Sequence, residues 1–237
     1  MKTKALKRFL LTLVCTTLTI ALGACSGDKA GGDSSQITIG IPQDIEDSLD
    51  PHKAVAAGTE EVLFNLYEGL VKPDSNGELQ PAVASDFVIS EDAATYTFTL
   101  RDGVKFHDGS TVTAEDVKYS LDRCADTTNG DPLVAAFSHI KSISILDEKT
   151  VEVVLDGPDT SFLAYFDVAI IPASNEDPAG NPIGTGPYKY ASRAPQENFV
   201  IEKFDDYWGT PANIEHVTFK VCANADSIVM DLQGGSV

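Results

Sequence analysis

The sequence has 237 residues, with 36 acidic against 17 basic side chains and a formal net charge of −19. This acidic surplus argues against nucleic acid as a partner, and against attachment to an anionic membrane through a basic patch. Hydrophobic residues make up 43% of the chain, which is ordinary for a globular protein and too high for a disordered one. The length allows one or two domains with a substantial core.

Residues 1–24 have the features of a signal peptide. Four basic residues precede an apolar stretch from Phe9 to Leu22, which is shorter than the roughly 20 residues that a membrane-spanning helix needs. The run Leu22-Gly23-Ala24-Cys25 then resembles the lipobox of bacterial lipoproteins, in which the cysteine carries lipid such as palmitate and becomes the new N-terminus. An ordinary signal peptide with an incidental cysteine is the alternative. We expect Cys25 to be a lipid anchor and residues 25–36 to be a flexible linker.

Processing at this site would change the charge and the cysteine content. Without residues 1–24 the chain keeps 13 basic against 36 acidic side chains, a net charge of −23. With Cys25 used for lipid, only Cys124 and Cys222 remain. They could pair in an oxidising compartment or stay apart as buried thiols, and we favour two unpaired thiols in the core.

Short strands and helices alternate along the rest of the chain, which predicts a mixed α/β fold. The first strand is expected over residues 37–41. A helix should then run from Thr59 as its N-cap through Gly69, with one apolar face. The remaining expected elements are, in chain order, a turn at 74–77, a hairpin of 87–89 and 95–101, a helix opened by a Thr113–Asp116 capping box and ending at Arg123, a hairpin that turns at 147–150, a short helix with Phe162 and Phe166, strands over 188–192, 199–203 and 217–221, and a helix over 226–233.

Patterns that carry chemistry are weak or missing. The four histidines are scattered and none stands in a His-Glu-x-x-His pair, so a zinc hydrolase has no support. His107 and Asp108 are adjacent, but neighbours on an extended segment point apart and Asp108-Gly109 indicates a turn. The loop Gly184-Thr185-Gly186-Pro187 lacks the third glycine and the following helix of a phosphate site. We therefore expect no catalytic residues, no metal site, no cofactor and no enzyme activity.

The acidic residues occur as dispersed pairs, which favours a solvated surface. The alternative is an electrostatic field that attracts cationic ligands.

Several segments together resemble one family, in that family's own order along the chain. They are Leu49-Asp50-Pro51-His52-Lys53-Ala54, Leu66-Tyr67-Glu68-Gly69-Leu70-Val71, Thr95-Tyr96-Thr97-Phe98-Thr99-Leu100-Arg101, Val104-Lys105-Phe106-His107-Asp108-Gly109, Thr113-Ala114-Glu115-Asp116-Val117, Asn181-Pro182-Ile183-Gly184-Thr185-Gly186-Pro187-Tyr188 and Tyr207-Trp208-Gly209. This set is similar to the extracellular solute-binding proteins of family 5, the oligopeptide- and dipeptide-binding lipoproteins of ABC importers. The motifs have scaffold roles, so they identify the family better than its ligand.

The resemblance implies a fold and a division of the chain. The fold would be an α/β lobe of the class II periplasmic-binding-protein type, with mixed sheets and helices. It would be incomplete because family members are about twice as long, and we expect the second lobe to be missing. The expected parts are a signal peptide over 1–24, a lipid-anchored linker over 25–36, a partial and discontinuous first lobe over 37–57 and 172–237, and an inserted α/β subdomain of that lobe over 58–171.

The resemblance also implies a function. The protein would be a monomeric receptor, anchored by Cys25 on the extracytoplasmic face of the cell membrane. It would capture small peptides by lobe closure and deliver them to an ABC permease and ATPase complex. Nickel chelates, opines or sugars are alternative ligands, and a surface sensor or adhesin without transport is an alternative role. The expected ligand-binding residues are Gln43 and Asp44 in the segment after the first strand, and Gly58 and Thr59 in the loop that follows. The alternative is that these segments are plain connectors.

Overall fold

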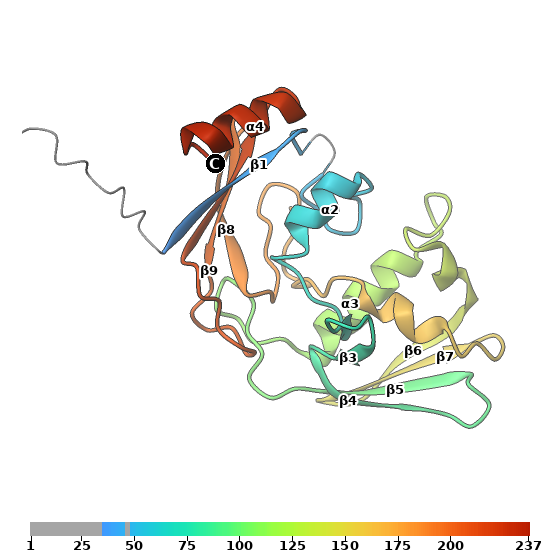
Figure 1. Cartoon of the computed structure of the whole chain (residues 1–237). Helices are drawn as coiled ribbons and strands as arrows, with labels where there is room; N and C mark the ends of the chain where they lie inside the picture. The colour runs from blue at the N-terminus through green and yellow to red at the C-terminus, as the bar shows by residue number, and fades with distance from the viewer. Residues whose placement is uncertain (1–34, 46–47) are drawn as a thin grey trace, which may run out of the picture. The chain divides into compact units, whose positions relative to one another are not determined.

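Two four-stranded sheets carry most of the described chain, which comprises residues 35–45 and 48–237 of the computed structural model (Figure 1). The first sheet has the order β1-β10-β9-β8. β1 pairs in parallel with β10, while the β10–β9 and β9–β8 pairs are antiparallel. The strands of this sheet are β1 (Gln36–Ile41), β8 (Tyr188–Ala194), β9 (Asn198–Lys203) and β10 (His216–Val221).

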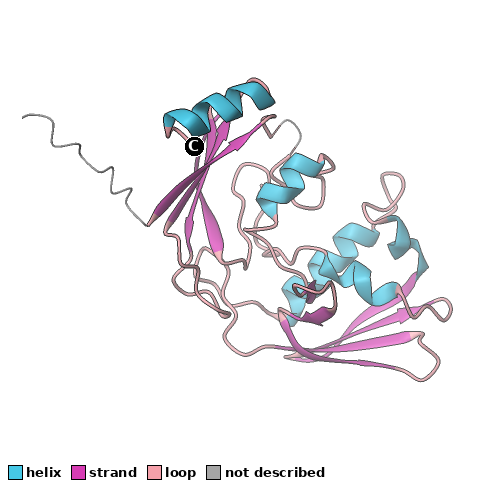
Figure 2. Ribbon diagram, viewed as in Figure 1, coloured by secondary structure: helices cyan, strands magenta, loops and turns pink. Residues whose placement is uncertain are grey.

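The second sheet is antiparallel throughout and has the order β4-β5-β7-β6. Figure 2 shows helices on one face of this sheet, and the opposite face carries the exposed Val88 and Thr99. The strands of this sheet are β4 (Ala84–Ile89), β5 (Thr95–Leu100), β6 (Ile140–Asp147) and β7 (Thr150–Leu155). A small antiparallel ladder of β2 (Val71–Pro73) and β3 (Leu79–Pro81) lies between the two regions along the chain.

Three α-helices and two short 3₁₀ helices complete the described chain. α4 lies against β1 of the first sheet, and α3 packs on β6 and β7 of the second. The helices are α2 (Ala57–Leu63), α3 (Ala114–Ala125), α4 (Ala225–Gly234), η1 (Ala135–His139) and η2 (Phe162–Asp167).

Each sheet has its own hydrophobic core. In the second core, the alternation Tyr96, Phe98 and Leu100 points inward, and the Phe98 and Phe166 rings meet edge to face with centroids 4.7 Å apart. The first core joins segments that are distant in the sequence. Its buried residues are Ile45, Leu49, Val62, Leu63, Leu66, Tyr67, Ile171, Phe199, Ile201, Val217 and Phe219.

Most expected elements are present, and the mixed α/β class of the lobe is confirmed. The capping box is also confirmed, since the Thr113 hydroxyl accepts from the Asp116 amide and the Asp116 carboxylate accepts from the Thr113 amide. Cys124 and Cys222 are buried free thiols, as expected. The expected division of the chain, with residues 37–57 and 172–237 in the first lobe and 58–171 in an inserted subdomain, stays a prediction. Val62 and Leu63 of α2 fall within the expected subdomain but pack in the first core.

The expectation for the first helix is wrong at both ends. The N-cap residue is Ala56, three residues before Thr59, and it makes no side-chain cap hydrogen bond. The helix ends at Leu63 and does not reach Gly69, because the next carbonyls bond elsewhere. The Leu66 carbonyl accepts from the Gly186 amide at 2.9 Å, and Leu70 already belongs to the second core.

Candidate functional site

The segment that follows β1 carries the first two expected ligand residues. Gln43 is exposed, and Asp44 is partly buried. The Asp44 carboxylate accepts hydrogen bonds from the Ile45 amide at 2.8 Å, the Gln196 amide at 2.8 Å and the Arg193 guanidinium at 3.2 Å. Burial alone would raise the pKa of Asp44, but these hydrogen bonds outweigh it and lower the pKa. Asp44 is therefore an ionised group that fixes the segment after β1 against the β8–β9 turn.

The other two expected residues lie in the first turn of α2. Gly58 is exposed, and a Cβ added there would meet no atom within 4 Å. Thr59 is buried, with 2% of its surface accessible. Two large apolar side chains flank α2 and are open to solvent, namely Val55 before the helix at 81% exposure and Phe64 at its C-cap at 68%. Sequence reasoning singled out neither residue.

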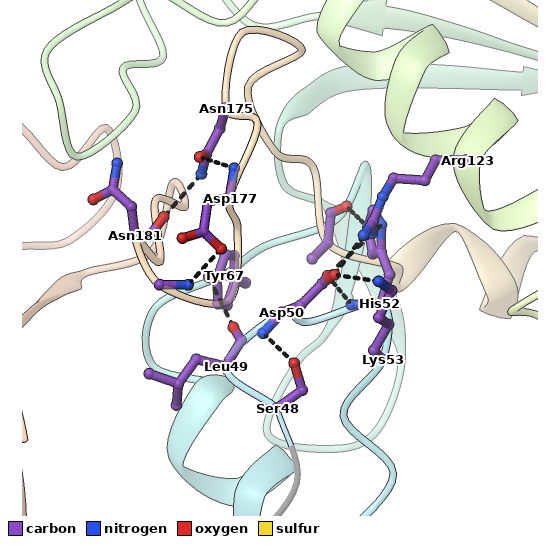
Figure 3. A network of polar contacts seen from close by, with 12 residues as sticks. Ser48, Leu49, Asp50, His52, Lys53, Tyr67, Arg123, Asn175, Asp177 and Asn181 are labelled. Atoms are coloured by element: carbon purple, nitrogen blue, oxygen red, sulfur yellow. Dashed lines mark hydrogen bonds and ion pairs between the residues drawn. The ribbon is translucent and has the colours of Figure 1, made fainter.

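A buried ion pair holds the loop between β1 and α2 (Figure 3). Asp50 is 2% exposed, and both of its carboxylate oxygens accept from the Arg123 guanidinium, with Arg123 Nη1 at 3.0 Å from Oδ1. The Asp50 carboxylate also accepts from the His52 amide at 3.2 Å. Because Arg123 belongs to α3, this bidentate pair ties the loop to a helix of the second core.

His52 extends this network to a third segment. Its Nε2 lies 2.7 Å from the Ala169 carbonyl oxygen, and its Nδ1 lies 2.6 Å from Arg123 Nη1. A carbonyl only accepts and a guanidinium only donates, so His52 must be the neutral tautomer with its proton on Nε2. Burial, followed by the nearby Arg123 charge, lowers the pKa of His52 in agreement with this assignment.

The hydrogen bonds around this pair reach further along the loop (Figure 3). The Tyr67 hydroxyl donates to the Leu49 carbonyl at 3.3 Å, and the Asp50 amide donates to Ser48 Oγ at 3.1 Å. Leu49, Asp50 and His52 therefore have roles in positioning the loop. The three side chains of the buried ion pair and its histidine, Asp50, His52 and Arg123, are called the clamp below.

A second polar cluster surrounds Glu68 at the start of the second core. Glu68 Oε1 accepts from Lys72 Nζ at 2.6 Å and from the Tyr207 hydroxyl at 2.7 Å, and Oε2 accepts from Trp208 Nε1 at 2.6 Å. The Arg101 guanidinium lies 4.2 Å from the centre of the Trp208 ring. This cluster gives Tyr207 and Trp208 of the motif set a structural role, because both side chains donate hydrogen bonds to one buried carboxylate whose charge is paired with Lys72.

The glycine loop at residues 184–186 packs where no side chain would fit. A Cβ on Gly184 would lie 2.1 Å from the Leu66 carbonyl oxygen, and one on Gly186 would lie 2.6 Å from the Asn65 carbonyl oxygen. His107 secures the same loop, since its Nδ1 accepts from the Gly184 amide at 3.2 Å and its Nε2 lies 3.2 Å from the Gly186 carbonyl oxygen. The loop is thus a junction between the two cores, where its glycines allow the two backbones to approach closely.

These networks position the backbone and leave no arrangement typical of catalysis. His107 bonds to backbone groups, while the neighbouring Asp108 carboxylate accepts from Ser110. Within residues 35–45 and 48–237, no cluster of three or more His, Cys, Asp or Glu residues could hold a metal ion. In the same ranges, no helix is long and apolar enough to cross a bilayer. The expected signal peptide over 1–24 and the expected lipid anchor Cys25 lie outside the described residues.

Comparison with known proteins identifies the scaffold. Residues 78–237 match the sequence model of the bacterial extracellular solute-binding proteins, family 5, middle part. The glutathione-binding protein GsiB of Pectobacterium atrosepticum is 32% identical over 198 residues, which cover 79% of this chain and 38% of that protein.

Solved structures agree with this match. DppA, an ABC transporter-associated periplasmic binding protein from Helicobacter pylori solved with the peptide STSA, superimposes with a TM-score of 0.77 at 27% identity, over 85% of this chain and 45% of that one. AgaA from A. tumefaciens R10, solved with agropinic acid, gives a TM-score of 0.79 at 30% identity, over 85% and 43%. This chain thus spans less than half the length of these relatives. It belongs to the bacterial extracellular solute-binding proteins of family 5.

Proposed function

We propose that this protein captures small peptides outside the cytoplasm and delivers them to the permease and ATPase of an ABC importer. The observation that carries the proposal is the family match over residues 78–237. Two similar proteins support a peptide ligand: DppA was solved with the peptide STSA, and GsiB is named for glutathione, which is itself a γ-linked tripeptide. Family membership also supports a receptor that binds its ligand without breaking a bond, and that acts as a monomer.

We propose that the ligand lies on the surface formed by the end of β1 and the start of α2. Gln43, Asp44, Gly58 and Thr59 remain the expected contact residues. Gly58 supplies open space, whereas Asp44 is already bonded and would act by holding the segment around Gln43. The exposed Val55 adds an apolar contact for a ligand side chain. Residues 35–237 would then contribute one wall of a cleft that closes around the ligand.

The ligand class can be tested by thermal unfolding and calorimetry of the purified protein with a panel of compounds. We expect di- to pentapeptides to raise the melting temperature in a concentration-dependent way, because a ligand that binds only the folded state stabilises it. Stabilisation by sugars or nickel chelates, with none by peptides, would refute the peptide assignment.

The location of the ligand can be tested separately with Gly58→Leu. A leucine side chain there would occupy the open space and should abolish peptide binding while the melting temperature without ligand is preserved. Gly157→Leu is the matched control, since a Cβ at Gly157 also meets no atom within 4 Å and lies in the second region. Equal binding by the two variants would place the ligand elsewhere.

A second candidate ligand class is favoured by one observation. AgaA, which is 30% identical to this chain, was solved with agropinic acid. Opines therefore belong in the same panel, and selective stabilisation by an opine would assign the protein to opine uptake.

Transport and anchoring need experiments in cells. A deletion strain should lose uptake of the stabilising ligand, and retained uptake would favour the sensor or adhesin role. We also propose that Cys25 carries the lipid that holds the protein on the extracytoplasmic face of the membrane. Cys25→Ala should release the protein into the soluble fraction, and continued membrane retention would contradict the lipobox assignment.

A further inference from the structure

A pocket lies apart from Gly58 and the β1 end, at the place where the chain passes from the first core to the second. Its volume is about 400 Å³, within the range of pockets that hold small ligands. Its walls come from the end of α2, β2, the end of η2, the start of β8 and the segment after β9. The lining residues are Phe64, Asn65, Tyr67, Glu68, Gly69, Val71, Lys72, Pro73, Asp167, Pro187 and Tyr207.

The charges in this pocket leave one carboxylate without a partner. Glu68 and Lys72 form an ion pair at 2.6 Å, so together they contribute no net charge. Asp167 is the third charged residue of the lining, and its only hydrogen bond among the described residues comes from its own backbone amide. The pocket therefore has a net charge of one negative unit, located on Asp167.

The position of Asp167 makes this charge available to a ligand. The residue is accessible to solvent, while the surrounding protein removes part of the water from its carboxyl group and raises its pKa. A carboxylate in such a place gains more from a bound cation than one in bulk water. Lys72 cannot supply that cation, because its ammonium is engaged by Glu68 and the Tyr207 hydroxyl.

The other walls suit an apolar body that carries the cation. Phe64 is 68% exposed at the edge of the pocket, and the rings of Tyr67 and Tyr207 also contribute to the lining. Aromatic faces attract organic ammonium ions as well as apolar groups. Val71 and Pro187 add apolar surface without further charge.

We propose that this pocket is a binding site for an organic ammonium ion, a primary or quaternary amine with an apolar substituent, whose charged group pairs with Asp167 and whose apolar part lies on Phe64. An anion of the same shape would face Asp167 and Glu68 and be repelled. A neutral analogue would leave the Asp167 carboxylate unpaired. The site is separate from the proposed peptide surface and does not depend on transport.

The experiment compares three probes of nearly the same shape, 2-phenylethylamine, 2-phenylethanol and phenylacetate, by calorimetry and NMR titration of the full chain. We expect the amine to bind at least about tenfold more tightly than the alcohol, and the carboxylate not to bind. Asp167→Asn should reduce the affinity for the amine to that for the alcohol. Glu91→Gln is the matched control, because it removes one exposed carboxylate outside the pocket and should leave binding unchanged.

A second variant tests the apolar half of the site. Phe64→Ala should weaken binding of both the amine and the alcohol by about threefold to tenfold, whereas Val88→Ala, at a similar exposure of 64%, should not. All four substitutions are at exposed positions, and their unfolding curves should match that of the parent. Equal affinity for amine and alcohol, an unchanged Asp167→Asn variant, or no binding of the amine would each overturn the proposal.

Discussion

The two cores of the molecule are built in opposite ways. The core of the second sheet comes from one uninterrupted stretch of chain, from Leu70 to Ile170, folded as hairpins with a capped helix. The core of the first sheet combines Ile45 and Tyr67 with Phe199 and Phe219. Its strand β1 pairs in parallel with β10, and Ile37 faces Val217 across that pair. The first core therefore depends on apolar contacts between distant segments. A few buried polar and backbone groups add further long-range contacts where this core meets the second one.

The clamp, the glycine loop and His107 are the groups that make those long-range contacts. Asp50 and Arg123 are 73 positions apart in the sequence, and His107 lies 77 positions from Gly184. Damage to these groups should destabilise the junction far more than similar changes on the surface of the second region.

Breaking the clamp should have the largest effect. Arg123→Met leaves the Asp50 carboxylate buried without its partner, and we expect the free energy of unfolding to fall by about 4 kcal/mol. Lys118→Met on the same helix is the control. It removes the exposed Lys118–Asp122 pair, which is worth about 0.3–0.5 kcal/mol. Denaturant titration of both variants measures the difference, and similar losses would show that the clamp is no more important than a surface pair.

Filling the close contact at the glycine loop should come next. Gly184→Ala would place a Cβ 2.1 Å from the Leu66 carbonyl oxygen, so either the glycine loop or the backbone that follows α2 must move. We expect a loss of about 3 kcal/mol of unfolding free energy. Urea denaturation, with Gly157→Ala as a control at an open position, checks this. If Gly184→Ala loses no more unfolding free energy than Gly157→Ala, the contact between the glycine loop and Leu66 is not as close as in this structure.

Acid should weaken the same junction through His107. Burial lowers the pKa of His107 to about 4, whereas the unfolded chain titrates near 6.5. Between these values the unfolded state binds more protons, so stability is complete above pH 6.5 and falls as the pH drops towards 4. This group alone should cost about 2 kcal/mol between pH 7 and pH 5.

Variants of two histidines separate this effect from general acid sensitivity. His107→Gln should flatten the dependence of unfolding free energy on pH over this window, with a residual slope from His52, whose pKa is also lowered. His139→Gln, at an exposed histidine, should keep the parental slope. If the His107 variant has the parental slope too, the junction does not titrate through this residue.

The smallest effect should be a gain. Gly58→Ala adds a methyl group in α2 where no atom lies within 4 Å, and it removes the conformational freedom of glycine from the unfolded chain. We expect an increase of about 0.5 kcal/mol in unfolding free energy. Thermal unfolding checks it. A clear loss of unfolding free energy would contradict the open space that the structure shows around Gly58.

Much of the second region could be predicted from the sequence, although β2, β3 and η1 were not expected and β4 begins three residues earlier than expected. The alternation Tyr96, Phe98 and Leu100, the Thr113–Asp116 capping box and the turn at 74–77 are local patterns, and each formed as its residue types require. The ordered motifs were also sufficient to identify the family.

The candidate site was predictable only in part. Gln43, Asp44, Gly58 and Thr59 stay a prediction as ligand contacts. Gln43 and Gly58 are exposed, but the sequence contained no sign that Thr59 would be buried or that Ala56 would be the N-cap of α2. Val55 and Phe64 were not expected, because exposure of an apolar side chain depends on what packs over it. Arg123 carried no local signal at all.

Local sequence patterns were enough to predict the mixed α/β class, many of the helices and strands, and the family, because residues close together in the chain interact in whatever fold they join. Tertiary structure alone decided the Asp50–Arg123 pair, the three bonds to Glu68 and the end of α2 at Leu63. It also decided that Asp167 has no partner in its pocket. The reason is physical: each of these depends on which distant carbonyl, ring or guanidinium the folded chain brings within 3 Å, and no local pattern encodes that distance.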